Sequence, residues 1–396
     1  MIRYRKILHL DLDAFFCAVE EQLNPSLKGK KFAVGGNPDR RGVVSTCSYA
    51  ARKFGVHSAM PINEAYRRCP QGIFVTPRMS VYEEVSDAII AIFNQYTPCI
   101  EKISIDEAFL DMSGTEKIFG SSMDAARKLS AQVRKEQDLT ASVGIAPNKF
   151  LAKIASDMNK PNGITMVPFA PEKIVQWLSP LKIEKMWGVG KKSAEIFAHT
   201  GVTTIGELQE LSLEYLQERF GKQGVVYYYL SRGIDDRPVG EDGAVKSISR
   251  EKTFNTDTSD REVWKKTLHA LAQDVARRAR QYGVKGYTVF LTYRTPDFSR
   301  HTRQKSLSDP TNIARVIYEQ VLPLLDQVQV FSLRLIGLGI TKLDEELQTS
   351  LFDVPPITKK LEISEAVADK IRQRFGSNVL RKGLEIDDGK ETGNDL

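Results

Sequence analysis

The chain has 396 residues, of which 41% are hydrophobic and 27% are charged, enough apolar material for roughly two to four globular domains. Its four cysteines are scattered and form no CxxC pair, which disfavours a disulfide framework or a structural zinc site and favours a reducing compartment. The sequence shows no apolar run of about 18 residues and no secretory signal. We therefore expect a cytoplasmic protein that does not bind membranes, and we expect it to be a monomer.

Charge is distributed unevenly along the sequence, although the formal net charge is only +6. Residues 246–342 contain 17 lysines and arginines against 9 acidic residues, whereas residues 343–396 contain 8 against 12. A basic segment of this size is typical of a nucleic-acid-binding domain. A solvated basic face is the alternative, and charge alone leaves the two interpretations equally open.

The first part of the sequence alternates short strands with helices. Apolar periodicity predicts a buried strand over 7–12 and a helix from about Ala14 to Gln22. The stretch Ile100–Met112 predicts two buried strands that meet at a turn. Together these elements predict an α+β layer, a mixed sheet with helices on one face. Further strands are expected at Lys31–Gly35, Gly42–Ser45, Ala141–Ile145 and Gly163–Val167, and further helices from Ser48 to about Lys53 and at Pro61–Cys69, Val81–Tyr96, Met123–Gln137 and Asn148–Met158.

From Pro168 the sequence changes to short helices separated by glycine turns. The stretch Gly233–Gly243 is typical of a linker. Residues 246–342 are predicted to form a separate α/β unit. The acidic segment from Asp344 is expected to be loosely attached, with one helix over Ser364–Phe375 that Ser364 caps. The short helices are expected at Pro171–Leu178, Lys191–Thr200, Ile205–Gln209 and Leu213–Phe220; the basic unit is expected to contain strands at Ser247–Phe254, Tyr287–Arg294 and Leu333–Thr341 and helices at Asp260–Tyr282 and Thr311–Leu325.

Three carboxylates are candidates for a metal site. Asp106 and Glu107 stand at the turn of the predicted hairpin, and Asp11 lies near the end of the first strand. Mg²⁺ prefers oxygen ligands, and two such ions ~3.5–4 Å apart can activate an attacking oxygen and stabilise a leaving one. Each acid could instead lie solvated at a strand end, and the acids alone leave both readings open. Asp13 directly precedes a helix and fits an N-cap, so we assign Asp13 and Asp111 structural roles.

Three further residues could bind a triphosphate. Tyr49 and Arg52 are three residues apart on one face of a predicted helix near its N-terminus, and Lys160 lies in a loop between a helix and a strand. A helix N-terminus, a hydroxyl and a guanidinium together suit phosphate oxygens. Singly, each of the three could be an ordinary surface residue.

A glycine turn could contact DNA. Gly188 and Gly190 open a predicted helix, and a lysine pair, Lys191 and Lys192, follows them. Backbone N–H groups in such a turn can hold a DNA phosphate without reading its sequence. A plain corner between two helices is an equally good interpretation of the turn alone.

Five ordered sequence blocks add a family resemblance. They resemble Y-family DNA polymerases, of the bacterial DNA polymerase IV type, over about residues 2–343. The combination of Ser-Ile-Asp-Glu with Tyr-x-x-Arg is highly specific. The blocks are Leu10-Asp11-Leu12-Asp13-Ala14-Phe15-Phe16, Tyr49-Ala50-Ala51-Arg52-Lys53-Phe54-Gly55-Val56, Ser104-Ile105-Asp106-Glu107-Ala108-Phe109-Leu110-Asp111, Ser142-Val143-Gly144-Ile145 and Lys160-Pro161-Asn162-Gly163.

The resemblance implies a right-hand polymerase fold and an activity. The activity is template-directed, low-fidelity translesion synthesis by nucleotidyl transfer from a dNTP to a primer 3′-hydroxyl, without a 3′→5′ proofreading exonuclease. Two Mg²⁺ ions are implied as cofactors, for which Mn²⁺ can substitute. The implied domains are a ferredoxin-like palm (1–13 and 79–167), small fingers (14–78), a helical thumb with a helix-hairpin-helix (168–235), a linker (236–245), an α/β little finger that binds DNA (246–343) and a tail (344–396).

The resemblance also implies roles for single residues. It makes Asp11, Asp106 and Glu107 the catalytic acids and adds the Leu12 carbonyl as a metal ligand. Phe16 becomes the steric gate, an aromatic ring that contacts the dNTP and excludes a ribose 2′-hydroxyl by clash. The triphosphate is expected to contact Tyr49, Arg52 and Lys160, and the primer–template DNA is expected to contact Gly188, Gly190, Lys191 and Lys192.

The tail contains one further motif. Gln348-Thr349-Ser350-Leu351-Phe352 is similar to the peptide by which bacterial polymerases dock on the sliding clamp (its beta subunit). Leu351 and Phe352 would fill a hydrophobic pocket while Gln348 hydrogen-bonds at its edge. In many relatives this peptide ends the chain, whereas here residues 353–396 follow it.

Two other functions compete with this interpretation. A catalytically silent DNA-binding relative would have lost the acids, and all three are present. A different two-metal palm enzyme, such as a nucleotide cyclase, would have no duplex to hold and so no need for the thumb-like and basic segments. Primer extension with Mg²⁺ and four deoxynucleotides would separate the three.

Overall fold

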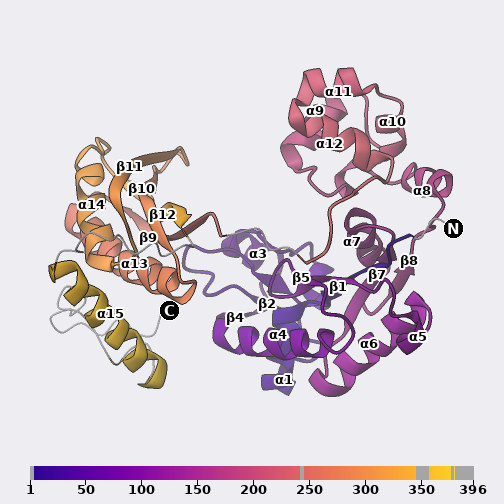
Figure 1. The fold of residues 1–396 in the computed structure, drawn as a ribbon, viewed down its shortest axis with the longest axis horizontal. Helices are drawn as coiled ribbons and strands as arrows, with labels where there is room; N and C mark the ends of the chain where they lie inside the picture. Colours follow the sequence, from indigo (N-terminus) through magenta and orange to yellow (C-terminus); the bar gives the residue numbers. More distant parts are fainter. Residues whose placement is uncertain (1–3, 241–244, 345–355, 376–378, 380–396) are drawn as a thin grey trace. The chain divides into compact units, whose positions relative to one another are not determined.

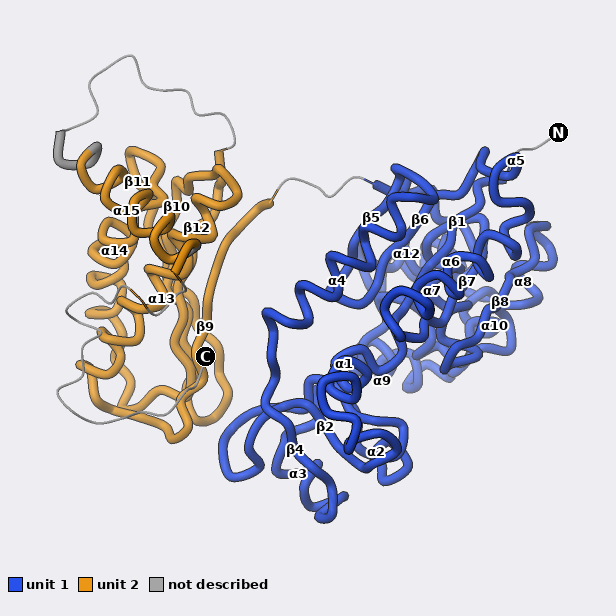
Figure 2. Tube along the Cα trace, turned by 90° about the horizontal axis from the view of Figure 1, so that it is seen from below, with its two compact units in different colours: residues 1–242 blue, residues 243–396 orange. Residues whose placement is uncertain are grey.

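The computed structural model describes residues 4–240, 245–344, 356–375 and 379. The chain divides into two compact units, residues 1–242 and 243–396 (Figure 1, Figure 2). No helix within the described ranges is long and apolar enough to cross a lipid bilayer. The expected α+β multidomain architecture is confirmed, and each unit is built around its own main sheet.

The first unit is centred on a five-stranded sheet with the order β5-β6-β1-β7-β8. Its middle strand, β1, is antiparallel to both β6 and β7, and β8 is parallel to β7. The expected mixed sheet is therefore confirmed, including the hairpin of β5 and β6. The strands are β1 (Ile7–Leu12), β5 (Ile100–Lys102), β6 (Glu107–Asp111), β7 (Ala141–Ala146) and β8 (Ile164–Met166).

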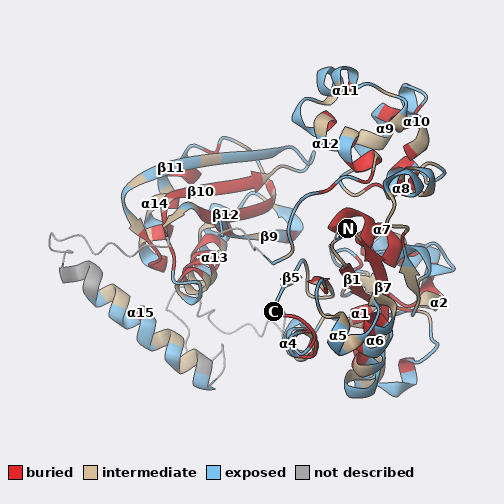
Figure 3. Cartoon of the chain, turned by 45° about the vertical axis from the view of Figure 1, so that its right-hand side comes forward, coloured by how far each residue is buried: buried red, intermediate tan, exposed pale blue. Residues whose placement is uncertain are grey.

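Helices cover both faces of this sheet. Leu8, Leu10 and Leu12 of β1 pack into one core with α1, α4 and α6, whereas Ile7 belongs to a second core with α7. The expectation of helices on one face was wrong, because β1 and β7 are buried along their whole length and need an apolar layer on each side (Figure 3). The helices are α1 (Phe15–Leu23), α4 (Met79–Phe93), α5 (Glu116–Phe119), α6 (Ser122–Gln137) and α7 (Lys149–Met158).

A smaller sheet with the order β3-β2-β4 has its own apolar core. The strand expected at Gly42–Ser45 is displaced, because pairing occurs at Thr46–Cys47 and Val43 forms only an isolated bridge to Pro61. The third strand, β4, is too short to show a periodicity and was not predicted. The elements are a 3₁₀ turn η1 (Pro25–Leu27), β2 (Phe32–Val34), β3 (Thr46–Cys47), α2 (Tyr49–Arg52), α3 (Ile62–Arg68) and β4 (Ile73–Val75).

The remainder of the first unit is helical. The four expected helices form, and a further one, α12, follows them. Sequence periodicity could not find α12, because the run Tyr227-Tyr228-Tyr229 places aromatic rings on more than one side of it. The elements are α8 (Pro171–Leu178), η2 (Ile183–Lys185), α9 (Lys191–His199), α10 (Ile205–Gln209), α11 (Leu213–Phe220) and α12 (Lys222–Ser231).

The second unit is a four-stranded antiparallel sheet with the order β11-β10-β12-β9 and an apolar core shared with α13 and α14. The edge strand β11 was not predicted, because its residues are mostly polar and exposed and so lack an alternating apolar pattern (Figure 3). Pro310 is tolerated there because an edge strand has one unpaired side. The elements are β9 (Ser247–Thr258), α13 (Arg261–Gln281), β10 (Lys285–Arg294), β11 (Arg300–Thr311), α14 (Ala314–Asp326) and β12 (Leu333–Asp344).

The tail helix α15 (Pro356–Phe375) is attached to this unit by ion pairs. Arg280 of α13 pairs with Glu365 and Asp369, and Lys285 pairs with Glu362 at 2.8 Å. The Glu365 carboxylate also accepts the first amide of α14, from Ala314, at 3.1 Å. Within the described part of the tail, residues 356–375 are therefore tied to the second unit and not loosely attached, and the expected N-cap was wrong, because Ser364 lies inside the helix.

Candidate active site

Three acids stand at one end of the β1–β6 strand pair. Asp11 and Glu107 are directly opposite each other in the antiparallel register. The Leu12 amide donates to the Asp106 carbonyl at 3.0 Å, which places Asp106 beside the end of β1. The Ser104 hydroxyl donates to Asp106 Oδ1 at 2.5 Å. Strand register and turn together therefore bring the predicted acids to the same end of the sheet.

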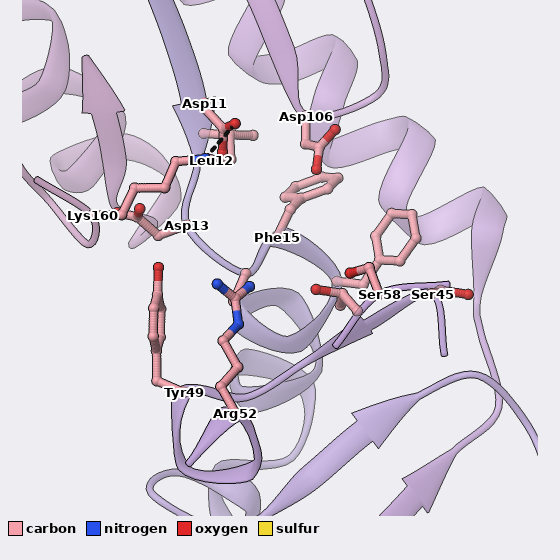
Figure 4. Close-up of a pocket in the computed structure, with 13 residues that line it drawn as sticks. Asp11, Leu12, Asp13, Phe15, Ser45, Tyr49, Arg52, Ser58, Asp106 and Lys160 are labelled. Atoms are coloured by element: carbon pink, nitrogen blue, oxygen red, sulfur yellow. Dashed lines mark ion pairs between the residues drawn. The ribbon is translucent and has the colours of Figure 1, made fainter. Parts of the chain in front are cut away.

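A pocket opens beside these acids. Figure 4 shows Asp11 and Asp106 at one end, Tyr49 and Arg52 at the other, and Lys160 reaching toward Asp11. Residues from β1, α1, the β3–α2 segment and three loops thus share one concave surface. Its lining is Asp11, Leu12, Asp13, Ala14, Phe15, Phe16, Ser45, Thr46, Tyr49, Arg52, Ser58, Asp106 and Lys160.

Lys160 neutralises Asp11. Its ammonium lies 2.6 Å from Asp11 Oδ2 and 2.7 Å from Asp157. Burial disfavours the charged lysine, but these two carboxylates outweigh it and raise the pKa of Lys160. For Asp11 the balance is opposite, since burial outweighs the lysine and raises its pKa to about 7. Burial and the neighbouring Glu107 thus oppose ionisation of Asp11, and Lys160 favours it.

Glu107 does not line the pocket, and its neighbours differ from those of Asp11. Its Oε2 contacts the ammonium of Lys153 and lies 3.7 Å from His9 Nε2. Burial alone would raise the pKa of Glu107, yet these neighbours hold it below its ordinary value. Sequence reasoning missed both neighbours. In the sequence, Lys153 shows only as a lysine within a helix, and His9 shows only as a histidine in an otherwise apolar strand.

Asp13 has a structural role, but a different one from the N-cap expected. It accepts hydrogen bonds from the Ser142 hydroxyl at 2.7 Å and from the Asn162 amide at 2.8 Å, so it ties the end of β1 to the loop that carries Lys160. The N-cap position of α1 is Ala14, in a left-handed conformation with φ 47° and without a side-chain cap. Asp111 accepts the Ser113 amide at 2.9 Å, a turn contact that fits its expected structural role.

Tyr49 and Arg52 lie together at the far end of the pocket. The Arg52 guanidinium is 4.6 Å from the centroid of the Tyr49 ring. The Tyr49 hydroxyl is buried and finds no hydrogen-bond partner in the described part of the chain, and burial raises its pKa to about 12. Because α2 has only four residues, the expected contribution of a helix N-terminus is small. The unpartnered hydroxyl and the guanidinium remain as groups for an anionic ligand.

Phe15 and Phe16 both line the pocket, but Phe15 is buried in the core whereas Phe16 is partly exposed. The Phe16 ring stacks on Tyr82 with a centroid distance of 4.3 Å and an interplanar angle of 15°. The Tyr82 hydroxyl donates to the buried Glu20 at 2.6 Å. The Phe16 ring therefore forms part of the pocket wall, is partly exposed, and packs against Tyr82.

Comparison with known proteins identifies the family. The "impB/mucB/samB family" matches residues 10–157, its C-terminal domain matches 245–351, and "DNA polymerase-iota, thumb domain" matches 184–235. The chain is 40% identical over 387 residues to DNA polymerase IV of Desulfatibacillum aliphaticivorans, covering 96% of this chain and 97% of that one. The chain belongs to the Y-family of DNA polymerases. It is thus a DNA-directed DNA polymerase of the translesion type.

Other relatives and solved structures agree with this assignment of the Y-family polymerase. DNA polymerase IV of Clostridioides difficile is 41% identical over 352 residues, covering 88% of this chain and 96% of that one. A chimera of the polymerases Dbh and Dpo4 has a TM-score of 0.76 at 28% identity, covering 86% of this chain and all of that chain. An insertion ternary complex of Dbh has a TM-score of 0.61 at 28% identity, covering 85% of this chain and 98% of that chain.

The thumb turn of this Y-family polymerase is exposed. Gly188 has φ 96°, a left-handed conformation that favours glycine, and Gly190 precedes the first residue of α9. Lys191 and Lys192 are exposed beside them. The turn is therefore accessible to a ligand. The expected clamp-binding residues Gln348, Leu351 and Phe352 lie outside the described residues.

The acids of this Y-family polymerase fit magnesium by their chemistry. Within the described residues, no three acidic, histidine or cysteine side chains stand close enough to hold an ion as they are. The oxygens of Asp11, Asp106, Glu107 and the Leu12 carbonyl are nevertheless the donor type that Mg²⁺ takes. Ammonium groups contact two of these carboxylates, so cations already compensate them.

The structural role of Asp13 predicts the behaviour of an Asp13→Asn variant. Asparagine can still accept from Ser142, but its amide would face the Asn162 N–H, so one buried bond is lost. We expect the free energy of unfolding to fall by about 1–3 kcal/mol while primer extension persists. Chemical denaturation followed by intrinsic fluorescence, together with a gel extension assay, measures both. A stable variant without extension would instead mean that Asp13 is a metal ligand.

Proposed function

We propose that the pocket beside β1 and β6 is the nucleotidyl-transfer site, where a primer 3′-hydroxyl attacks the α-phosphate of a bound dNTP. The observation that carries this proposal is the composition of one pocket. Carboxylate and carbonyl oxygens stand at one end of it, and phosphate-binding groups stand at the other. The first set is Asp11, Leu12 and Asp106, with Glu107 opposite Asp11; the second set is Tyr49, Arg52 and Lys160.

The acids would hold two Mg²⁺ ions, for which Mn²⁺ can substitute. When bound, the metals supply a lowered pKa at the primer hydroxyl and neutralise the triphosphate and the pyrophosphate leaving group. The chain supplies the remaining contacts. The Tyr49 hydroxyl gains an acceptor in a phosphate oxygen, the Arg52 guanidinium pairs with the same group, and Lys160 exchanges Asp11 for a phosphate.

The second unit would bind the primer–template duplex through its phosphates. Its basic composition supports this role, and such binding weakens steeply with salt. We further propose the palm, fingers, thumb and linker boundaries expected from the sequence, and a cytoplasmic location. Expression of residues 246–343 alone tests the last domain boundary, since a domain must fold by itself.

Removal of one acid should separate chemistry from binding. For Asp106→Ala we expect primer extension to fall by about 10²–10³-fold or more, with duplex affinity nearly unchanged. Substitution of Lys191 and Lys192 by alanine should instead weaken duplex affinity, while primer extension at saturating DNA persists. Gel extension and fluorescence anisotropy measure the two properties. Unchanged extension by the Asp106 variant would refute the site.

Phe16 is proposed as the steric gate, because its ring is exposed to the pocket and backed by Tyr82. Phe16→Ala should remove the clash with a ribose and reduce the preference for dNTP over NTP, as a ratio of kcat/KM, by about tenfold or more. Phe16→Tyr keeps the ring and serves as the matched control. Continued exclusion of ribonucleotides by the alanine variant would remove this role.

Residues 348–352 are proposed as a sliding-clamp peptide on their sequence alone. Their deletion should leave basal primer extension intact and abolish its stimulation by the clamp, since the peptide is remote in sequence from the acids. Extension on primed circular DNA with and without clamp measures the stimulation. Undiminished stimulation would discard the docking role.

A further inference from the structure

Lys153 connects the helix α7 to the catalytic end of the sheet. Its ammonium contacts Glu107 Oε2, and both side chains are about four-fifths buried, with relative exposures of 20% and 22%. The helix that carries Lys153 lies very close to the sheet. A Cβ at Gly144 in β7 would stand only 1.9 Å from the Ala152 carbonyl oxygen. The position of Lys153 is therefore fixed by packing and not by the ion pair alone.

The donor to Glu107 can be assigned to Lys153. His9 also points at Glu107, but its Nδ1 is 2.8 Å from the Ser156 hydroxyl, and that hydroxyl donates to the Lys153 carbonyl at 2.8 Å. Nε2 of His9 lies 3.7 Å from Glu107 Oε2, beyond hydrogen-bond distance, and has no hydrogen-bond partner within the described residues. Lys153 is thus the side chain that donates to the carboxylate.

Lys153 differs from Lys160 in where it acts. Lys160 lines the pocket and can exchange Asp11 for a phosphate, whereas Lys153 does not line the pocket and has the Trp187 ring 6.0 Å away. The Lys153 ammonium donates to Oε2 of Glu107. The other carboxylate oxygen can therefore ligate a metal without this contact being given up.

We propose that Lys153 is a positioning residue that holds Glu107 by one carboxylate oxygen and presents the other to a metal ion. The inference rests on the proposed function, in which Glu107 is a metal ligand. Partners that orient metal ligands in this way commonly contribute 10–100-fold to metal affinity. Lys153 itself contacts neither substrate nor metal, so its effect should appear in metal affinity.

The test measures Mn²⁺ affinity without turnover. Electron paramagnetic resonance of free Mn²⁺ is recorded for the polymerase with a dideoxy-terminated primer–template and the matching dNTP. Lys153→Met keeps the stem but removes the ammonium, and should raise the Mn²⁺ dissociation constant about tenfold. Lys153→Arg should restore most of the affinity. Lys153→Gln, which should show an intermediate loss, replaces the methionine variant if that does not fold.

Lys149→Met is the matched control. Lys149 lies one helical turn earlier on α7 and forms a more deeply buried pair with Glu101 at 2.7 Å, but it touches none of the proposed ligands. Its loss should lower stability and leave the Mn²⁺ dissociation constant unchanged. A Lys153→Met variant that binds Mn²⁺ as tightly as wild type, or more tightly, overturns the inference.

Glu107→Gln distinguishes this failure from failure of the proposed function. If Glu107→Gln weakens Mn²⁺ binding and Lys153→Met does not, only the positioning role is wrong. If Glu107→Gln also leaves the dissociation constant unchanged, Glu107 is not a metal ligand, and both the site assignment and the positioning role are overturned.

Discussion

The opposition of Asp11 and Glu107 across β1 and β6 is the constraint on which the active end of the first unit depends. Side chains directly opposite on antiparallel strands are about 5 Å apart, where two negative charges repel by roughly 3 kcal/mol at an effective dielectric constant near 20. Partial burial adds a desolvation cost. The fold can tolerate both acids only because a cation accompanies each of them.

Both cations come from one short segment of the chain. Lys153 lies in the middle of α7, and Lys160 lies in the loop that follows this helix. The two ion pairs therefore depend on how α7 lies on the sheet, and that in turn depends on Gly144, where any side chain would strike the helix backbone. Asp13 fixes the other end of the segment through the Asn162 amide. Gly144, α7 and Asp13 thus determine where the two lysines lie beside the acids.

Much of this arrangement could be predicted from the sequence, because its signals are local. Adjacent acids at the turn of an apolar hairpin, and an acid near the end of a buried strand, make Asp106, Glu107 and Asp11 candidates for a metal site. The family resemblance of the ordered blocks then favours this role over solvated strand ends. Lys153 could not be found in this way, since a single lysine in a helix resembles a solvated residue and its partner is 46 residues away. The same limit applies to β11, whose polar residues carry no alternating pattern, and to α15, whose attachment depends on Arg280, 85 residues from Glu365.

The pocket hydroxyl of Tyr49 has a consequence for ligand selection. A buried donor without a partner costs roughly 1–3 kcal/mol, and the Tyr49 hydroxyl has no protein partner within the described residues. An occupant whose oxygen accepts from Tyr49 recovers this energy on binding, whereas an occupant of the same shape without that oxygen does not. Converted at 1.4 kcal/mol per tenfold, the difference is about 5- to 150-fold in affinity. In the proposed site, Tyr49 would thus favour ligands that place an acceptor oxygen against its hydroxyl.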